Sequence, residues 1–126
     1  MRFLISLLFV FASQSVLAES ADRWCDGQFA RHSLAKGEIK SMNITHVQKG
    51  ILLAMELQTI AGVRAMCNDN QREIREFCAA DRSIVNADAA KMETSENLTE
   101  DQKNRIAEMN AQTNQIVELV INEMCN

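Results

Sequence analysis

Proline is absent from all 126 residues of this chain, although proteins contain on average about one proline in twenty residues. Proline ends or kinks an α-helix because its ring fixes φ and its nitrogen carries no hydrogen. A chain without proline therefore favours long, uninterrupted helices. Their boundaries must then be set by capping residues and by the spacing of apolar side chains.

Two helices are predicted in the first half of the chain. We expect the first over about residues 21–36, ending at Gly37, because glycine tolerates the left-handed conformation that closes a helix. Thr45 and Gln48 then have the spacing of a capping box. The helix that begins there and ends at Cys67 is apolar on more than one face, which predicts that it lies at the centre of the fold.

Two further helices are predicted in the second half. The Asn-Asp-Asn segment 68–70 is typical of a turn, and a third helix follows over about residues 71–92. Thr99 begins a second capping box and opens a fourth helix that runs to about residue 124, with Thr113 as one polar layer in its apolar seam. The sequence therefore predicts an all-α fold, a small up-and-down bundle of about four helices.

Residues 1–18 have the pattern of a secretory signal peptide. Arg2 is followed by an apolar stretch from Phe3 to Ala12, and small residues stand at Val16 and Ala18. The apolar run is too short to span a bilayer, and we expect no other stretch to approach the roughly 20 apolar residues of a membrane helix. The protein is therefore expected to be periplasmic or secreted, with no membrane insertion.

The mature chain, residues 19–126, is expected to form a single helical domain. Removing the signal peptide removes only Arg2 from the charged residues, which leaves 12 basic against 17 acidic side chains and changes the formal net charge from −4 to −5. Nucleic acids and anionic membranes bind basic surfaces, so neither is an expected partner. A basic protein would be attracted to this chain.

An even number of cysteines in a small exported chain predicts two disulfides. No pair has the C-x-x-C spacing of a zinc or redox site, and the two histidines, His32 and His46, are far apart in the sequence. We therefore expect no metal and no cofactor. The disulfide cysteines are Cys25, Cys67, Cys78 and Cys125.

Helix geometry favours one pairing of these cysteines. If the third helix begins near Gln71, Cys78 lies about 10 Å along it from the turn after Cys67, whereas a disulfide allows about 7 Å between Cα atoms. Cys125 should return to the level of Cys67, and Cys25 should lie near the level of Cys78. We prefer the pairs Cys25–Cys78 and Cys67–Cys125, and the other two pairings stay open.

The sequence offers no set of residues that predicts catalysis. Neither histidine is near a serine or cysteine in a known nucleophile pattern, and there is no glycine-rich phosphate loop. Pairs of acidic residues such as Glu73 and Glu76 are common on solvated helix faces. We therefore expect a protein that is not an enzyme.

Two predicted loops, residues 36–44 and 93–99, should lie at the same end of an up-and-down bundle. Exposed loops on a rigid scaffold are common binding surfaces. Asn43 and Asn97 also begin N-glycosylation sequons, although each sequon ends in a threonine that is predicted to cap a helix. The candidate partner-binding residues are Lys36, Glu38, Lys40, Met42, Asn43, Glu93, Ser95, Glu96 and Asn97.

The organisation of the chain resembles that of the periplasmic immunity proteins of bacterial type VI secretion systems. The shared traits are a signal peptide, a short helical chain and four cysteines with one near each mature end, here Cys25 and Cys125. The resemblance extends over the whole chain, rests on no specific motif and transfers no functional residue. It implies a protein that plugs the active-site cleft of a cell-wall hydrolase, in many cases as a homodimer.

The charge agrees with such a role, because many wall-cleaving enzymes are basic and would be steered toward an acidic binder. The expected function is therefore that of an exported inhibitor or immunity protein against a peptidoglycan hydrolase effector. The alternative is a helical carrier of a small apolar ligand, since methionines can line adaptable pockets. A third option is a structural or stress-protective exported protein.

Overall fold

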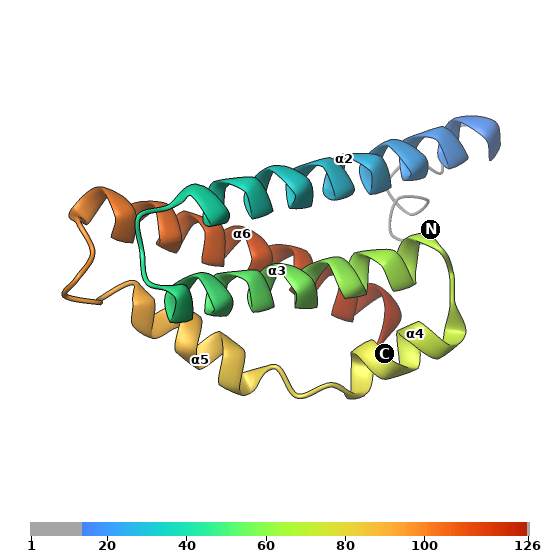
Figure 1. Ribbon diagram of the computed structural model, residues 1–126. Helices are drawn as coiled ribbons and strands as arrows, with labels where there is room; N and C mark the ends of the chain where they lie inside the picture. Colours follow the sequence, from blue (N-terminus) through green and yellow to red (C-terminus); the bar gives the residue numbers. More distant parts are fainter. Residues whose placement is uncertain (1–13, 126) are drawn as a thin grey trace.

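The computed structural model describes residues 14–125 and confirms the all-α fold, with no strand in that range. The predicted signal peptide lies mostly outside the described residues, and residues 14–18 form the first turn of the first described helix. The helices are α2 (Gln14–Ser41), α3 (His46–Cys67), α4 (Gln71–Ala79), α5 (Ser83–Met92) and α6 (Glu100–Met124) (Figure 1).

The helices follow an up-and-down path (Figure 1). α2 and α3 are antiparallel, α4 and α5 together form the third leg, and α6 returns along α3. Both predicted capping boxes are confirmed, at Thr45 before α3 and at Thr99 before α6. Asp69 has a positive φ of 49° in the predicted turn after α3. α3 contacts the other four helices, so its predicted central position is also confirmed.

Among the described helices, α3 is long and apolar enough to cross a membrane by length and composition alone. The sequence prediction that no such stretch follows the signal peptide was therefore wrong. Half of the apolar window is buried inside the bundle. The central helix of a bundle meets the same criterion because it is apolar on most of its faces.

α2 continues past Gly37, where the sequence predicted its end, and stops at Ser41. Gly37 has no positive φ, and the next turn of the helix buries Ile39, which is 0% exposed. Burying an isoleucine contributes about 1.5–3 kcal/mol, whereas a helical glycine costs about 1 kcal/mol. Tertiary packing therefore extends the helix. Two residues predicted to lie in a loop, Glu38 and Lys40, are helical as a result, and Lys36, at the predicted boundary, lies inside the helix.

The predicted third helix is interrupted between α4 and α5, which gives five described helices rather than about four. Ala80 is extended, with φ −69° and ψ 139°. The Arg82 guanidinium donates to the carbonyl of Phe77 (2.6 Å) and lies 4.3 Å from the centre of its ring. The Asp81 carboxylate accepts from the backbone N–H and the hydroxyl of Ser83 (3.0 and 2.7 Å). This Asp-x-Ser turn was the signal that the sequence analysis missed.

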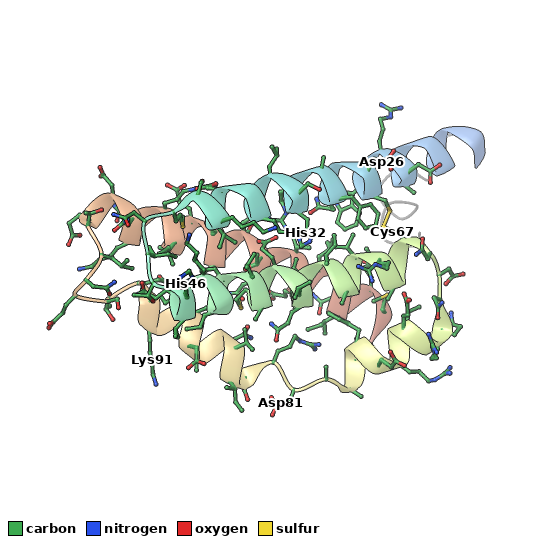
Figure 2. The ribbon with its side chains drawn as sticks, in the orientation of Figure 1. Asp26, His32, His46, Cys67, Asp81 and Lys91 are labelled. Atoms are coloured by element: carbon green, nitrogen blue, oxygen red, sulfur yellow. A yellow bond between two sulfur atoms is a disulfide. The ribbon has the colours of Figure 1, made fainter. Side chains whose placement is uncertain are left out.

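The two disulfides join Cys25 to Cys67 and Cys78 to Cys125, so the preferred pairing was wrong. Each closes a loop of more than forty residues, with sequence separations of 42 and 47. By the loss of chain entropy in the unfolded state, a loop of that length contributes about 4 kcal/mol. Figure 2 shows Cys67 at the end of the bundle opposite His46. The staples therefore hold the end where α3 and α6 finish.

The pairing error follows from the two misplaced helix ends. Because α2 runs to Ser41, Cys25 lies about 24 Å from the end of its helix, which brings it down to the level of Cys67. α4 is a short helix that packs on α3 and on the end of α6. Its Cys78 therefore lies beside Cys125, at the end of the bundle, and not farther along it.

The core is divided into two clusters. The upper cluster lies toward the α2–α3 and α5–α6 connections, and the lower cluster surrounds the disulfides. The upper cluster contains Ala35, Ile39, Leu52, Met92, Leu98, Ile106 and Met109. The lower cluster contains Ile60, Val63, Met66, Phe77 and Val120, with Cys67, Cys78 and Cys125 packed against it.

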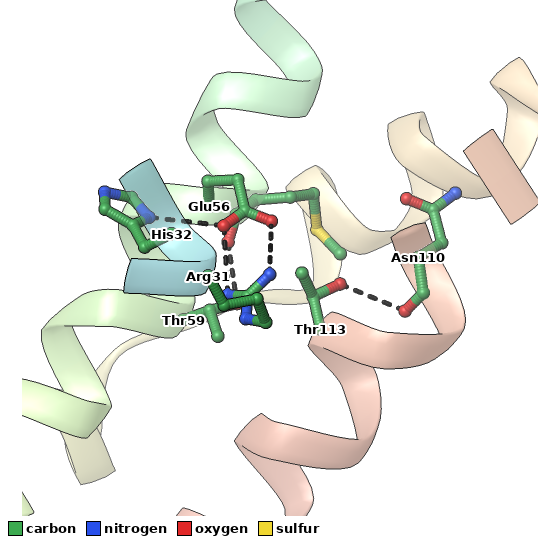
Figure 3. A network of polar contacts seen from close by, with 7 residues as sticks. Arg31, His32, Glu56, Thr59, Asn110 and Thr113 are labelled. Atoms are coloured by element: carbon green, nitrogen blue, oxygen red, sulfur yellow. Dashed lines mark hydrogen bonds and ion pairs between the residues drawn. The ribbon is translucent and has the colours of Figure 1, made fainter. Parts of the chain in front are cut away.

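Figure 3 shows a layer of buried polar side chains. Along the sequence of each helix that contributes to it, this layer lies between the residues of the upper cluster and those of the lower cluster. Glu56 is 2% exposed, and its carboxylate accepts from Arg31 Nη2 at 3.0 Å and Nη1 at 3.3 Å. His32 Nδ1 lies 3.2 Å from Glu56 Oε1. Thr113, the predicted polar position of α6, is 2% exposed and donates to the carbonyl of Asn110 (3.0 Å). The layer joins α2 to α3 by a buried ion pair.

Candidate functional site

The candidate site is the end of the bundle formed by residues 42–45 and 93–99, which we call the loop end. These segments connect α2 to α3 and α5 to α6, and both lie at the end away from the disulfides (Figure 1). The Gln102 side chain of α6 ties them together, because its Oε1 accepts from the N–H of Thr99 (2.9 Å) and its Nε2 donates to the carbonyl of Asn43 (3.1 Å). The structure therefore brings the two segments to one surface.

The 93–99 segment is held in place by a reciprocal pair of amides. Gln48 Nε2 donates to Asn97 Oδ1 (2.9 Å), and Asn97 Nδ2 donates to Gln48 Oε1 (3.1 Å). Gln48 is 9% exposed and also closes the capping box by accepting from the N–H of Thr45 (3.0 Å). Below the segment, Leu98 is buried in the upper cluster. This connection is therefore rigid rather than a free loop.

Several predicted partner-binding residues also make contacts within the scaffold. Met42 is partly buried and packs against the upper cluster. Glu93 accepts from Asn110 Nδ2 (2.9 Å). Ser95 and Asn97 turn their side chains toward each other (3.1 Å) and toward Gln48. These residues therefore shape the loop end.

The three predicted residues on α2 lie beside the loop end. Glu38 forms an ion pair with Arg105 of α6, with Nη2 2.7 Å from Oε1. The hydrogen bond from Arg105 holds the pKa of Glu38 below its ordinary value. The carbonyl of Lys40 accepts from Lys49 Nζ (2.7 Å). Lys36 is half-buried and Lys40 is exposed.

The residues that remain exposed at the loop end are mainly polar and acidic. Asn43, Glu96 and Asn97 are the predicted partner-binding residues that are exposed in the two connections. Glu100 and Asp101 follow in the first turn of α6, where the helix dipole favours negative charge. Val47, next to Gln48 in the chain, is 74% exposed. The surface therefore combines exposed carboxylates, of which Glu100 pairs with Lys103 Nζ at 3.4 Å, with one exposed apolar side chain.

The histidines do not form a metal site. His32 contacts Glu56 within the polar layer, and His46 is exposed in the first turn of α3. Among residues 14–125, no group of three or more His, Cys, Asp or Glu side chains is placed to hold a metal ion.

Comparison with known proteins found no relative. No family model, curated protein or solved structure matches the chain. The two disulfides nevertheless indicate an oxidising compartment outside the cytoplasm.

Proposed function

We propose that this protein is an exported binding module that neutralises a peptidoglycan hydrolase by occluding its active-site cleft with the loop end. It would act without catalysis and without a cofactor, in the periplasm or outside the cell, in the manner of type VI immunity proteins. The cysteines support export, because disulfides form and persist in oxidising compartments.

The observation that carries the proposal is the fixed conformation of the 93–99 segment. The Gln48–Asn97 amide pair joins this segment to the central helix, while Glu96 between its anchors stays exposed. A loop that is already ordered loses little conformational entropy when it enters a cleft, so more of the contact energy appears as affinity.

Charge supports a basic target. The chain carries a formal net charge of −4, and Glu96, Glu100 and Asp101 are exposed near one another in sequence. Complementary charge raises the rate of encounter between two proteins and disfavours partners of the wrong sign. A cell-wall hydrolase that binds an anionic substrate presents the matching surface.

The test begins with a pull-down from the native host, followed by mass spectrometry. We expect a peptidoglycan hydrolase, encoded beside the gene, to be captured and inhibited by the purified protein. Glu96→Lys should weaken inhibition at least tenfold, because it reverses a charge at the centre of the proposed contact.

The matched control is Glu118→Lys, which makes the same charge change at an exposed position on α6 outside the loop end. It should alter inhibition much less than Glu96→Lys. Equal effects of the two variants would show that net charge acts without the loop end. Failure to capture or inhibit any hydrolase would overturn the proposed function.

A further inference from the structure

A separate pocket lies between α3 and α4 and has a volume of about 320 Å³. Its apolar surface is formed by Ala61, Phe77 and Ala80. Its charged lining residues include Arg64 and Glu73. The volume is near the lower limit of about 300 Å³ for small-molecule sites. Its charged walls distinguish it from the apolar cavity that a carrier of apolar ligands would need.

Part of this pocket is fixed by internal contacts. Arg82 lines the pocket but is engaged by the carbonyl and the ring of Phe77. Gly62 allows Phe77 to lie against the α3 backbone, because a Cβ at Gly62 would lie 2.6 Å from Phe77 Cε1. Glu76 forms an exposed ion pair with Arg72 at 3.8 Å. The apolar floor is therefore preformed.

Two groups of opposite charge in the same pocket have no partner within the described chain. Glu73 Oε2 is buried and accepts no hydrogen bond from the described residues. Arg64 is exposed and forms no ion pair there, and the two side chains do not pair with each other although both line the pocket. A buried carboxylate oxygen without a donor is unfavourable, so an external donor would relieve it.

We propose that this pocket binds a small zwitterion of the amino-acid class with an apolar side chain. The ammonium group donates to Glu73, the carboxylate pairs with Arg64, and the side chain lies on Phe77 and the two alanines. Glu73 lies in the first turn of α4, where the helix dipole stabilises the charged carboxylate. The site is independent of the proposed inhibitor function, because it lies on α3 and α4 rather than at the loop end.

The test is an NMR titration of the disulfide-bonded protein with L-leucine and two analogues that each lack one charge. These are 3-methylbutylamine, without the carboxylate, and 4-methylpentanoate, without the ammonium group. We expect leucine to shift the amides of Ala61 and Phe77 and to bind at least tenfold more tightly than either analogue, since each charged hydrogen bond contributes to affinity.

Three variants assign the two contacts. Glu73→Gln and Arg64→Gln should each weaken leucine binding at least tenfold, whereas Glu118→Gln, at an exposed position on α6 away from the residues that line the pocket, should bind as the wild type does. Arg64→Gln should leave the affinity for 3-methylbutylamine unchanged. Shifts confined to other parts of the protein, equal affinity for leucine and its analogues, or equal losses in Glu73→Gln and Glu118→Gln would overturn the proposal.

Discussion

Replacing Glu56 by alanine tests how strongly the polar layer holds α2 against α3. The Glu56 side chain is 2% exposed and Arg31 is 16% exposed, and their two hydrogen bonds measure 3.0 and 3.3 Å. The alanine variant removes the carboxylate and leaves the Arg31 guanidinium without its partner. His32 also loses the contact at 3.2 Å.

The expected loss is about 3 kcal/mol in the free energy of unfolding. Removing one partner of a buried ion pair costs about 3–5 kcal/mol because the other charge is left uncompensated. The lower end applies here, since Arg31 is partly exposed and can turn toward water. The whole protein is expected to be stable by about 5–15 kcal/mol. The variant should therefore fold but with a large fraction of its stability lost.

Two further variants separate charge from shape and burial. Glu56→Gln keeps the size of the side chain but can accept through Oε1 alone, because its NH2 group is a donor that faces a donor of Arg31, and it should cost about 1–3 kcal/mol. Glu76→Ala removes an exposed ion pair with Arg72, in which the side chains are 69% and 74% exposed. Such pairs contribute about 0–1 kcal/mol. The buried and exposed pairs therefore predict clearly different losses.

The assay is urea denaturation with intact disulfides. Unfolding is monitored by far-ultraviolet circular dichroism and by the fluorescence of Trp24, the single tryptophan. The two probes should give the same transition, with an unchanged dependence on urea concentration. A loss below about 1 kcal/mol for Glu56→Ala, or a loss equal to that of Glu76→Ala, would refute the reasoning from burial.

Two other predictions concern local packing and acid. Gly62→Ala should destabilise the protein by about 1–3 kcal/mol, because its Cβ would lie 2.6 Å from Phe77 Cε1. The Cβ of Gly37→Ala meets nothing within 4 Å, so this variant should be more stable than the wild type by about 0.5–1 kcal/mol. Thermal melts that reverse this order would contradict the packing argument. Arg105 lowers the pKa of Glu38 in the folded state, so its contribution is present above the ordinary glutamate value of about 4.3 and is lost as pH falls through the lower folded pKa. Arg105 is 43% exposed and Glu38 is 35% exposed, so Glu38→Gln should cost at most about 1 kcal/mol at pH 7. Urea denaturation should show this cost shrinking steadily as the pH is lowered below about 4. A cost that does not change with acid would exclude this origin.

The helix boundaries set by local chemistry were predictable from the sequence. Thr45 and Thr99 form their capping boxes within four residues, so neighbouring residues contain all the information needed. The end of α2 was not predictable in this way. Gly37 is a reasonable stop signal, but burial of Ile39 in the upper cluster outweighs it, and that burial depends on residues far along the chain.

The same distinction applies to the candidate site. The two connections were located because capping residues mark their ends, and the up-and-down path brings them to one end of the bundle. The Gln48–Asn97 pair was not predictable, since the two residues are separated by 49 positions. Nor could the spacing of cysteines give their pairing, which depends on where α2 ends and where α4 turns aside.

Both disulfides lie at one end of this bundle, and non-covalent contacts hold the loop end at the other. The disulfides tie α2 to α3 and α4 to the end of α6, whereas the loop end is held by amide hydrogen bonds and by the upper cluster. Stability at the stapled end therefore does not depend on which side chains are exposed at the other. Glu96 lies between two anchors of its segment and makes no contribution to the upper cluster. A protein with this division can change the residues exposed at its loop end while its staples and core stay the same.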